Sequence, residues 1–534
     1  MSVRPLTCAR CLVLGILAGC AAEPSPADTS EESLGGAFAA GPIALTDEGL
    51  VRGIATDGTR RFLGIPYAAP PVGDARWRPP ARHARWHGVR DATQFGPHCP
   101  QGPSPFGLAS TTEDCLFLNV FVPAHRPGDR VELHPVMVWI HGGALVVGES
   151  DDYDPAQLVE QGDVIVVTIN YRLGALGFLA HPALTAESSD HVSGNYGILD
   201  QQAALAWVRR NIVFFGGNPF NVTIFGESAG GLSVHTQLAS PLAHGLFARA
   251  VAESGAYQLT QPSLATAENA GTAFAAQAGC ADQTAACLRG LSVTDVLSHQ
   301  SNAAGGTSPV VDGKVLPQSV GAAFSSGAMN RVPVIEGSNH DEWRLFVALD
   351  FDLVGGPVTA AGYPAAIQAT LGVPAAVVPL FVAAYPLAAY PSPDLALSAL
   401  GTDGIFACNA LKASGLLVQH VPTFAYEFND ENAPEIFLPP VSFPYGAAHA
   451  SELQYLFGLR HTVPAPPLDD AQEQLSDAMV GFWTHFARTG QPGDGWPRFD
   501  GTQLESLAPP SPTTETAAGF AADHKCAFWA SLTP

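Results

Sequence analysis

Short, largely apolar segments recur along this chain, and the longer segments between them carry apolar residues at every third or fourth position. A short apolar run is typical of a strand that is buried on both faces. The runs lie at 136–140, 164–169, 222–225, 332–335 and 423–428. Strands that alternate with helices favour a mostly parallel sheet with helices on both faces. The hydrophobic pattern therefore predicts an α/β fold.

Two helices are predicted most clearly by this spacing. Residues 199–212 carry Leu205, Val208 and Ile212 on one face, ahead of a Gly-Gly-Asn-Pro stop signal. A later helix presents one apolar face and is ended by glycine and proline, with the residues Leu475, Met479, Phe482, Phe486, Gly490 and Pro492.

Three other regions are less regular. The Ala/Pro/Leu-rich region 358–411 is interpreted as helices that lie over the sheet edge. Residues 41–80 begin with a hairpin-like pattern and continue into the proline-rich segment 62–73. Proline lacks a backbone N–H and has a fixed φ, so we expect neither a helix nor a central strand in that segment.

Composition and charge disfavour some classes of binding partner. The chain has 534 residues, of which 47% are hydrophobic and 14% are charged, as in a large globular protein. The formal net charge is −24. Such a charge disfavours nucleic acid and an anionic membrane surface as electrostatic partners.

The N-terminus has the pattern of a targeting segment. Arg4 and Arg10 precede or flank a short apolar run at 11–19, which is far below the roughly 20 residues needed to span a bilayer. The run ends in Leu-Ala-Gly-Cys20, which resembles a bacterial lipobox. We therefore expect a lipoprotein signal peptide at 1–19, a lipid anchor at Cys20, a flexible tether at 20–40 and one domain at 41–534. The mature protein would be lipid-anchored in the bacterial cell envelope, or secreted if it is not lipidated.

Cysteine usage agrees with export. Three of the nine cysteines fall in or next to the signal segment, and six remain: Cys99, Cys115, Cys280, Cys287, Cys408 and Cys526. Six cysteines can form three disulfides in an oxidising compartment, with 15 possible connectivities that spacing does not resolve. None of these six cysteines stands in C-x-x-C spacing, so no metal site is predicted.

The clearest candidate for chemistry is the pentapeptide G-x-S-x-G at 226–230. It follows the apolar run 222–225 and precedes small residues that open a helical segment. A strand, a sharp turn and a helix would expose Ser228 at the apex, with the positive end of the helix dipole directed at it. The motif alone is weak, because an ordinary glycine-rich turn has the same composition.

A nucleophilic serine needs a base, a group that orients the base, and donors for the oxyanion. Strand–loop order leaves three rival bases and three rival acids open: His340, His449 and His461, and Glu336, Asp341 and Glu342. The run His-Gly-Gly-Ala at 141–144 follows an early strand and can supply backbone N–H groups, together with Ala229.

At this point the chain resembles the type-B carboxylesterase/cholinesterase family of α/β-hydrolases from about residue 41 to the C-terminus. The segments that carry the resemblance are FLGIPYAAPPVG, EDCLFLNV, NYRLGALGF, GNYGILDQQAALAWV, VTIFGESAGG, GSNHDE, AAHASELQYLFG and CAFW. The resemblance implies an α/β-hydrolase fold with helical insertions near the site.

The resemblance also implies roles for individual residues. Ser228 would be the nucleophile, Glu342 the acid and His449 the base. Gly143, Ala144 and Ala229 would form the oxyanion hole, and Ser254 would support the acid. The remaining implied pairs are the disulfides Cys99–Cys115, Cys280–Cys287 and Cys408–Cys526 and a structural salt bridge between Arg76 and Glu113.

Two departures from the family pattern bear on specificity. The family commonly has H-G-G-G-F, whereas this chain has Ala144 and Leu145. A backbone N–H survives that change, so we expect the oxyanion hole to persist unless position 144 needs a positive φ. We expect Leu145 to remove an aromatic wall. The segment 99–115 has Phe106 but no Trp, which argues against a cholinesterase, because such enzymes hold a quaternary ammonium by cation–π contact.

The sequence thus predicts a serine hydrolase that cleaves small-molecule carboxylic esters through an acyl-enzyme. No cofactor or metal is required, and the only membrane association expected is through Cys20. An amidase or a lipase using the same residues is the enzymatic alternative. A non-catalytic adhesion or binding member of the family is the alternative outside enzymes.

Overall fold

A computed structural model describes residues 41–56, 58–124, 132–300 and 307–532 of the chain. The expected signal peptide, the anchor at Cys20 and the tether at 20–40 lie outside the described residues. From residue 41 onward the chain forms one compact unit.

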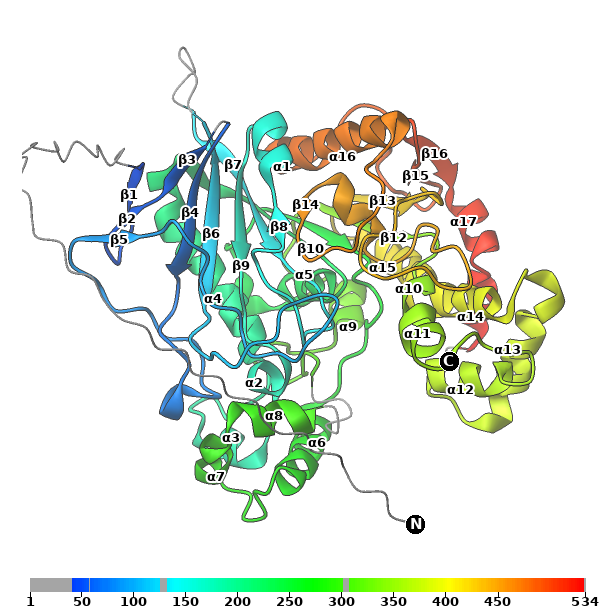
Figure 1. Cartoon of the computed structure of the whole chain (residues 1–534), viewed down its shortest axis with the longest axis horizontal. Coiled ribbons are helices and arrows are strands. Elements are labelled where there is room, and N and C mark those ends of the chain that lie inside the picture. The colour runs from blue at the N-terminus through cyan, green and yellow to red at the C-terminus, as the bar shows by residue number, and fades with distance from the viewer. Residues whose placement is uncertain (1–40, 57, 125–131, 301–306, 533–534) are drawn as a thin grey trace, which may run out of the picture. The chain divides into compact units, whose positions relative to one another are not determined.

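A central sheet of eleven strands organises this unit (Figure 1). Its order is β16-β15-β13-β12-β11-β10-β7-β9-β6-β4-β3. Neighbouring strands from β15 to β9 run parallel, whereas β16 at one end and β6, β4 and β3 at the other are antiparallel to their neighbours. The strands are β3 (Ile54–Thr56), β4 (Thr59–Pro66), β6 (Phe117–Pro123), β7 (His134–Ile140), β9 (Ile165–Ile169), β10 (Gly217–Glu227), β11 (Arg249–Glu253), β12 (Val334–Asn339), β13 (Thr423–Phe428), β15 (Gln503–Leu507) and β16 (Thr513–Thr516). The expected mostly parallel sheet is confirmed.

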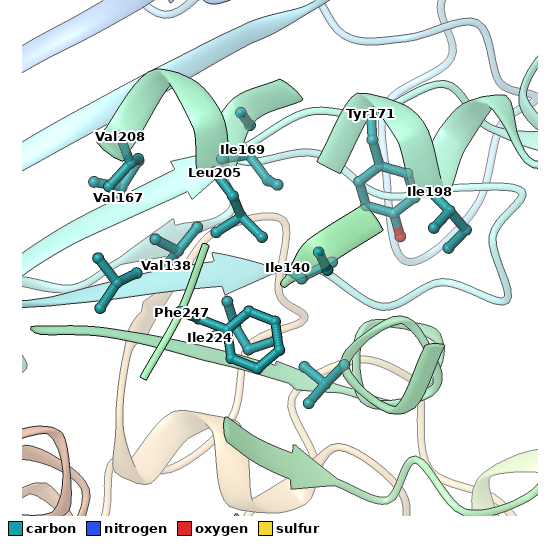
Figure 2. Close-up of a cluster of buried hydrophobic side chains, with 14 of the residues drawn as sticks. Val138, Ile140, Val167, Ile169, Tyr171, Ile198, Leu205, Val208, Ile224 and Phe247 are labelled. Carbon is teal, nitrogen blue, oxygen red and sulfur yellow. The ribbon is translucent and has the colours of Figure 1, made fainter. Parts of the chain in front are cut away.

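Alternation of side chains along the central strands separates two cores. Val138 and Ile140 of β7 pack with α4 (Tyr196–Asn211) and α5 (Ala229–Ala239) on one face, as Figure 2 shows in part. Met137 and Trp139 belong to the core on the opposite face, with α1 (Ala156–Gly162) and α16 (Asp470–Thr489). Successive residues of a strand point to opposite faces, so one continuously apolar strand supplies both layers.

Further elements surround this sheet. Two small sheets contain β1 (Ile43–Leu45), β2 (Leu50–Arg52) and β5 (Val89–Asp91), and β8 (Tyr153–Asp154) and β14 (Gly458–Leu459). The additional helices are α2 (Gly174–Phe178), α3 (Pro182–Glu187), α6 (Leu264–Gln277), α7 (Ala285–Gly290), α8 (Val293–His299), α9 (Val320–Ser326), α10 (Arg344–Val347), α11 (Leu353–Gly355), α17 (Ala517–Asp523) and α18 (Cys526–Leu532).

The region 358–411 is helical, as expected. It contains α12 (Tyr363–Leu371), α13 (Val378–Ala384), α14 (Pro393–Gly401) and the start of α15 (Cys408–Leu417). Within the described residues no single helix is long and apolar enough to cross a membrane. One sharply bent pair, at 363–371 and 375–389, passes by length and composition, and its buried side chains pack in a third core cluster.

Two local expectations need correction. The segment 62–73 was expected to exclude a central strand, yet its first five residues belong to β4, which pairs with β6 up to Pro66 and with β3 only at residues 59–61. Pro66 is the last residue of β4, so its missing N–H interrupts little of the ladder. In α16, Leu475, Met479 and Phe486 are fully buried, as expected, but Phe482 is only partly buried and its neighbour Trp483 is buried instead.

Candidate active site

Ser228 occupies a strained turn between the central strand β10 and helix α5. Its φ is +56° and its ψ is −119°, a conformation that non-glycine residues rarely adopt. The turn is possible because Gly226 and Gly230 lie against the backbone of Ile140. A Cβ at Gly230 would come within 1.9 Å of the Ile140 carbonyl oxygen, and one at Gly226 within 2.5 Å. The backbone N–H of Ser228 donates to the Glu253 carbonyl at 2.9 Å, which fixes the apex.

Glu342 and His449 meet although they follow different strands. His449 Nδ1 lies 2.5 Å from Glu342 Oε2, and the backbone N–H of His449 donates to the Glu342 carbonyl at 3.3 Å. The other carboxylate oxygen, Oε1, accepts the N–H of Asn339 at 2.8 Å. Glu342 is fully buried and His449 is 5% exposed. The carboxylate is therefore held on both oxygens and orients the imidazole ring.

Two further carboxylates surround His449, and sequence reasoning did not identify them. His449 Nε2 lies 3.1 Å from Oε1 of Glu227, and Glu452 accepts a hydrogen bond from the Asn339 side chain. Burial lowers the pKa of His449, but the charges of Glu227 and Glu342 outweigh that effect and raise the pKa to about 9. Burial raises the pKa of Glu227 well above its ordinary value. Both glutamates stand inside quoted motifs, G-E-S-A-G and S-E-L, which was the available signal.

The three residues expected to form the oxyanion hole offer backbone donors. Among the described residues no acceptor is found for the N–H groups of Gly143 and Ala144. Ala229 is the first residue of α5, where helix N–H groups lack an intrahelical acceptor. Gly143 and Ala144 line the same cavity as Ser228 and His449. These donors can serve a developing oxyanion there.

The departure from the family pattern at Ala144 and Leu145 has a conformational consequence. Both residues have positive φ, +54° and +61°. Position 144 therefore does need a positive φ, which was the condition under which alanine in place of the family's glycine would matter. Alanine is strained in that region of backbone conformation. Leu145 is buried in the first core cluster and is not among the residues that line the cavity. Its side chain therefore does not form the cavity wall.

The cavity above these groups is mainly apolar and has a volume of about 210 Å³. Three phenylalanines line it, Phe106, Phe346 and Phe437, and the Phe346 ring lies 5.0 Å from the His449 ring. Asp152 and Arg460 add charged groups to the lining. Such a site suits a mostly apolar small molecule with one polar reacting group.

The rival acids and bases are bonded elsewhere. The observed pairs are His340 with Asp341 and Asp523, His461 with Asp152, Glu336 with His235, and Asp341 with Arg344. Of the open candidates, the structure brings together only Glu342 and His449 beside Ser228. Possible metal ligands among the described residues do not include these three residues; they lie at His340, Glu427 and His524 and at Glu149, Asp152 and His461.

The family resemblance also implied a supporting serine, a salt bridge and three disulfides, and the structure contains the salt bridge and the disulfides but, among the described residues, no hydrogen bond from the serine hydroxyl. Ser254 is buried, but its hydroxyl has no hydrogen-bond partner among the described residues, so its expected support of Glu342 stays a prediction. Arg76 and Glu113 form the expected salt bridge, with Nε donating to Oε1 at 2.7 Å. The structure contains disulfides between Cys99 and Cys115, Cys280 and Cys287, and Cys408 and Cys526. Those are the pairings that the resemblance implies.

Comparisons with known proteins agree with this geometry. The model of the carboxylesterase family matches residues 40–529. The chain is 36% identical over 497 residues to pyrethroid hydrolase Ces2e of Rattus norvegicus, covering 87% of this chain and 86% of that protein. It is also 36% identical over 489 residues to para-nitrobenzyl esterase of Bacillus subtilis (strain 168), covering 87% of this chain and 94% of that protein. The chain therefore belongs to the carboxylesterase family, with the α/β-hydrolase fold, and is a carboxylic ester hydrolase.

Proposed function

We propose that this protein hydrolyses small carboxylic esters through an acyl-enzyme formed on Ser228. The observation that carries the proposal is the buried hydrogen bond between Glu342 and His449, beside a cavity that Ser228 and His449 both line. A serine hydroxyl becomes a nucleophile when a positioned base accepts its proton.

In the first half of the reaction, Ser228 Oγ attacks the ester carbonyl carbon while His449 Nε2 accepts the hydroxyl proton. Glu342 holds the ring in the tautomer that leaves Nε2 free, and it stabilises the imidazolium. The backbone N–H groups of Gly143, Ala144 and Ala229 bind the tetrahedral oxyanion. One such donor is typically worth about 3–4 kcal/mol of transition-state stabilisation.

Collapse of the tetrahedral intermediate releases the alcohol. His449 donates its proton to the leaving alkoxide oxygen, and the acyl group stays on Ser228. A water molecule then gives a proton to His449 and attacks the acyl carbonyl carbon, and His449 passes that proton to Ser228 Oγ as the acid leaves. Every step uses groups of this chain and water alone.

The assay is hydrolysis of p-nitrophenyl acetate and butyrate by the wild type and Ser228→Ala. We expect a loss of at least about 10⁴-fold in kcat for the variant. Stoichiometric labelling of the wild type by an organophosphate, absent in Ser228→Ala, would exclude a non-catalytic binding protein. Equal rates in the two proteins would overturn the mechanism.

The substrate class follows from the cavity. Its small volume and its phenylalanine lining favour esters with short or compact apolar groups over long acyl chains. A chain-length series of p-nitrophenyl esters measures this preference. Activation at an oil–water interface would instead indicate a lipase, and faster turnover of anilides than of matched esters would indicate an amidase.

We further propose that the mature protein is anchored to a bacterial membrane through a lipidated Cys20. The support is the lipobox-like sequence ahead of that cysteine. Mass spectrometry of the mature N-terminus tests this proposal. An unmodified N-terminus at a different residue would refute it.

A further inference from the structure

Two imidazoles and three carboxylates gather beside the ester cavity, and the proposed reaction uses none of them. They are His98, Glu149, Asp151, Asp152 and His461. Asp152 also lines the cavity, so the cluster borders its wall. Pairing of β14 with β8 brings the segment of His461 next to that of Asp152.

Glu149 lies at the centre of this cluster. Its Oε1 atom is 3.8 Å from His98 Nδ1 and 3.7 Å from His461 Nδ1. Both separations are too long for hydrogen bonds. Ligand bonds of about 2.0–2.1 Å at a tetrahedral angle give ligand atoms about 3.3 Å apart, so a shift of a few tenths of an ångström would bring His461 Nδ1 to that distance from Glu149. Asp152 contacts His461 Nδ1, and the ligand atoms of Glu149, Asp152 and His461 all lie within 4.8 Å of one another.

The central carboxylate is fixed before any ligand binds. Glu149 is fully buried. Its Oε1 accepts the backbone N–H of Leu108 at 2.9 Å, and its Oε2 accepts the Gln101 side chain at 3.1 Å. Each carboxylate oxygen has two lone pairs, so Oε1 keeps one that can bind a cation.

The imidazole of His98 lies close to Glu149 but outside this set of mutually close ligand atoms. Its Nε2 is 2.8 Å from Oδ1 of Asp151, and that oxygen has no hydrogen-bond partner among the described residues. His98 is therefore a neighbour of the site and not one of its ligands.

Charge also favours a cation at this place. Three carboxylates face two imidazoles, and no Lys or Arg forms an ion pair with these carboxylates within the part of the chain that the structure describes. A divalent cation would compensate the excess negative charge, which burial of Glu149 otherwise makes costly.

The other cluster of possible ligands is less suited to a metal. In that cluster both ring nitrogens of His524 contact carboxylates, Asp403 and Glu427, and both ring nitrogens of His340 do the same. An imidazole with both nitrogens bonded to carboxylates has no lone pair to offer, because each nitrogen carries a proton.

We propose that Glu149, Asp152 and His461 bind one divalent cation of the zinc class at the wall of the ester cavity, with water in the fourth position. Nitrogen and carboxylate ligands in a four-coordinate arrangement are typical of Zn²⁺. Binding displaces the proton shared between His461 and Asp152 into solvent. Sequence spacing did not reveal the site, because its ligands come from two distant segments.

Isothermal titration of the chelator-treated, full-length protein with Zn²⁺ alone tests the proposal. We expect one equivalent to bind to the wild type, and we expect binding to be lost in Glu149→Gln and in His461→Ala. His340→Ala removes a histidine of the rival cluster and should bind Zn²⁺ as the wild type does.

Thermal unfolding without metal checks that each variant is folded. If Glu149→Gln does not fold, His461→Ala decides, because that side chain is about one-third exposed. Absence of Zn²⁺ binding to the wild type, unchanged binding in His461→Ala, or loss of binding in His340→Ala would each overturn the proposal. The readout is heat rather than hydrolysis, so it does not depend on the proposed role of Ser228.

Discussion

The Nε2 atom of His449 lies 3.1 Å from Oε1 of Glu227, the residue immediately before the proposed nucleophile. The base is therefore placed between two glutamates, with Glu342 on its Nδ1 side. This arrangement couples the protonation of His449 to a carboxylate that has no part in orienting it.

Replacing Glu227 by Gln should shift the pH dependence of hydrolysis toward acid. His449 is a base only when it is neutral, so kcat/KM rises with pH as the ring loses its proton. Burial lowers the pKa of His449, and Glu227 is the first of the carboxylates that together raise it to about 9. Without the Glu227 charge, the midpoint of the acid limb should move to lower pH.

The measurement is kcat/KM for p-nitrophenyl butyrate across the pH range in both proteins. Glu336→Gln is a matched control, because that buried glutamate is paired with His235 and is not a major influence on His449. An unchanged midpoint in Glu227→Gln would show that this carboxylate is already neutral in the free enzyme.

Replacing Ala144 by Gly should stabilise the protein while leaving hydrolysis within a few-fold of wild type. Alanine at φ +54° is strained by about 1–2 kcal/mol, and glycine is not. The glycine variant has a more flexible unfolded chain, which offsets about 0.4–1 kcal/mol of this and leaves a gain of up to about 1.6 kcal/mol. The backbone N–H is retained in the variant.

Urea unfolding compares this variant with Ala273→Gly, which makes the same change at an exposed position inside α6. Ala273→Gly should cost about 1 kcal/mol. A loss of similar size in Ala144→Gly would show that the positive φ is not a source of strain.

Stability should fall at alkaline pH because of His524. Burial lowers its pKa, but hydrogen bonds to Asp403 and Glu427 dominate and raise it to about 10. A folded-state pKa above the unfolded value of about 6.5 stabilises the protein below pH 6.5, and the contribution disappears as the pH rises through about 10.

The apparent Tm should therefore decrease between neutral pH and pH values above about 10. In His524→Gln the Tm at neutral pH should already be low, because two buried carboxylates lose their cation at a cost of about 3–5 kcal/mol. The further alkaline decrease should be smaller in this variant. Parallel curves for the two proteins would exclude His524 as the group responsible.

Removing disulfides should destabilise the protein in an order set by loop length. Cys408 and Cys526 are separated by 118 residues, and Cys280 and Cys287 by 7. The chain-entropy relation gives about 5 kcal/mol for the first loop and about 2.4 kcal/mol for the second. Paired Cys→Ser variants compared by urea unfolding measure both values, and the reverse order would mean that local packing dominates.

Much of this fold could be predicted from the sequence because its central strands are buried on both faces. The runs at 136–140, 164–169 and 423–428 all correspond to strands of the main sheet. The last five residues of β4 were missed because Pro66 lies at the end of the strand, where proline does little harm. Trp483 was missed because spacing alone does not fix the angle of a helix face to within one residue.

The candidate site, like the fold, could be predicted from the sequence only in part. Order along the chain left His340, His449 and His461 as equal candidates, and only family resemblance selected His449 before geometry did. Glu227 was not identified, because its proximity to His449 depends on how two distant loops meet. The ligands proposed for zinc share that property, since pairing of β14 with β8 joins them.

The loops that carry Glu342 and His449 are joined by their backbones as well as by their side chains. The N–H of His449 donates to the Glu342 carbonyl, and the N–H of Asp341 donates to the Ala447 carbonyl at 2.9 Å. The proposed acid and base are therefore held together, whereas the proposed nucleophile is carried by β10, with β11 between β10 and β12. Small displacements would preserve the acid–base pair and change only its distance to Ser228. Damage elsewhere in the sheet should thus reduce activity by misaligning two intact halves.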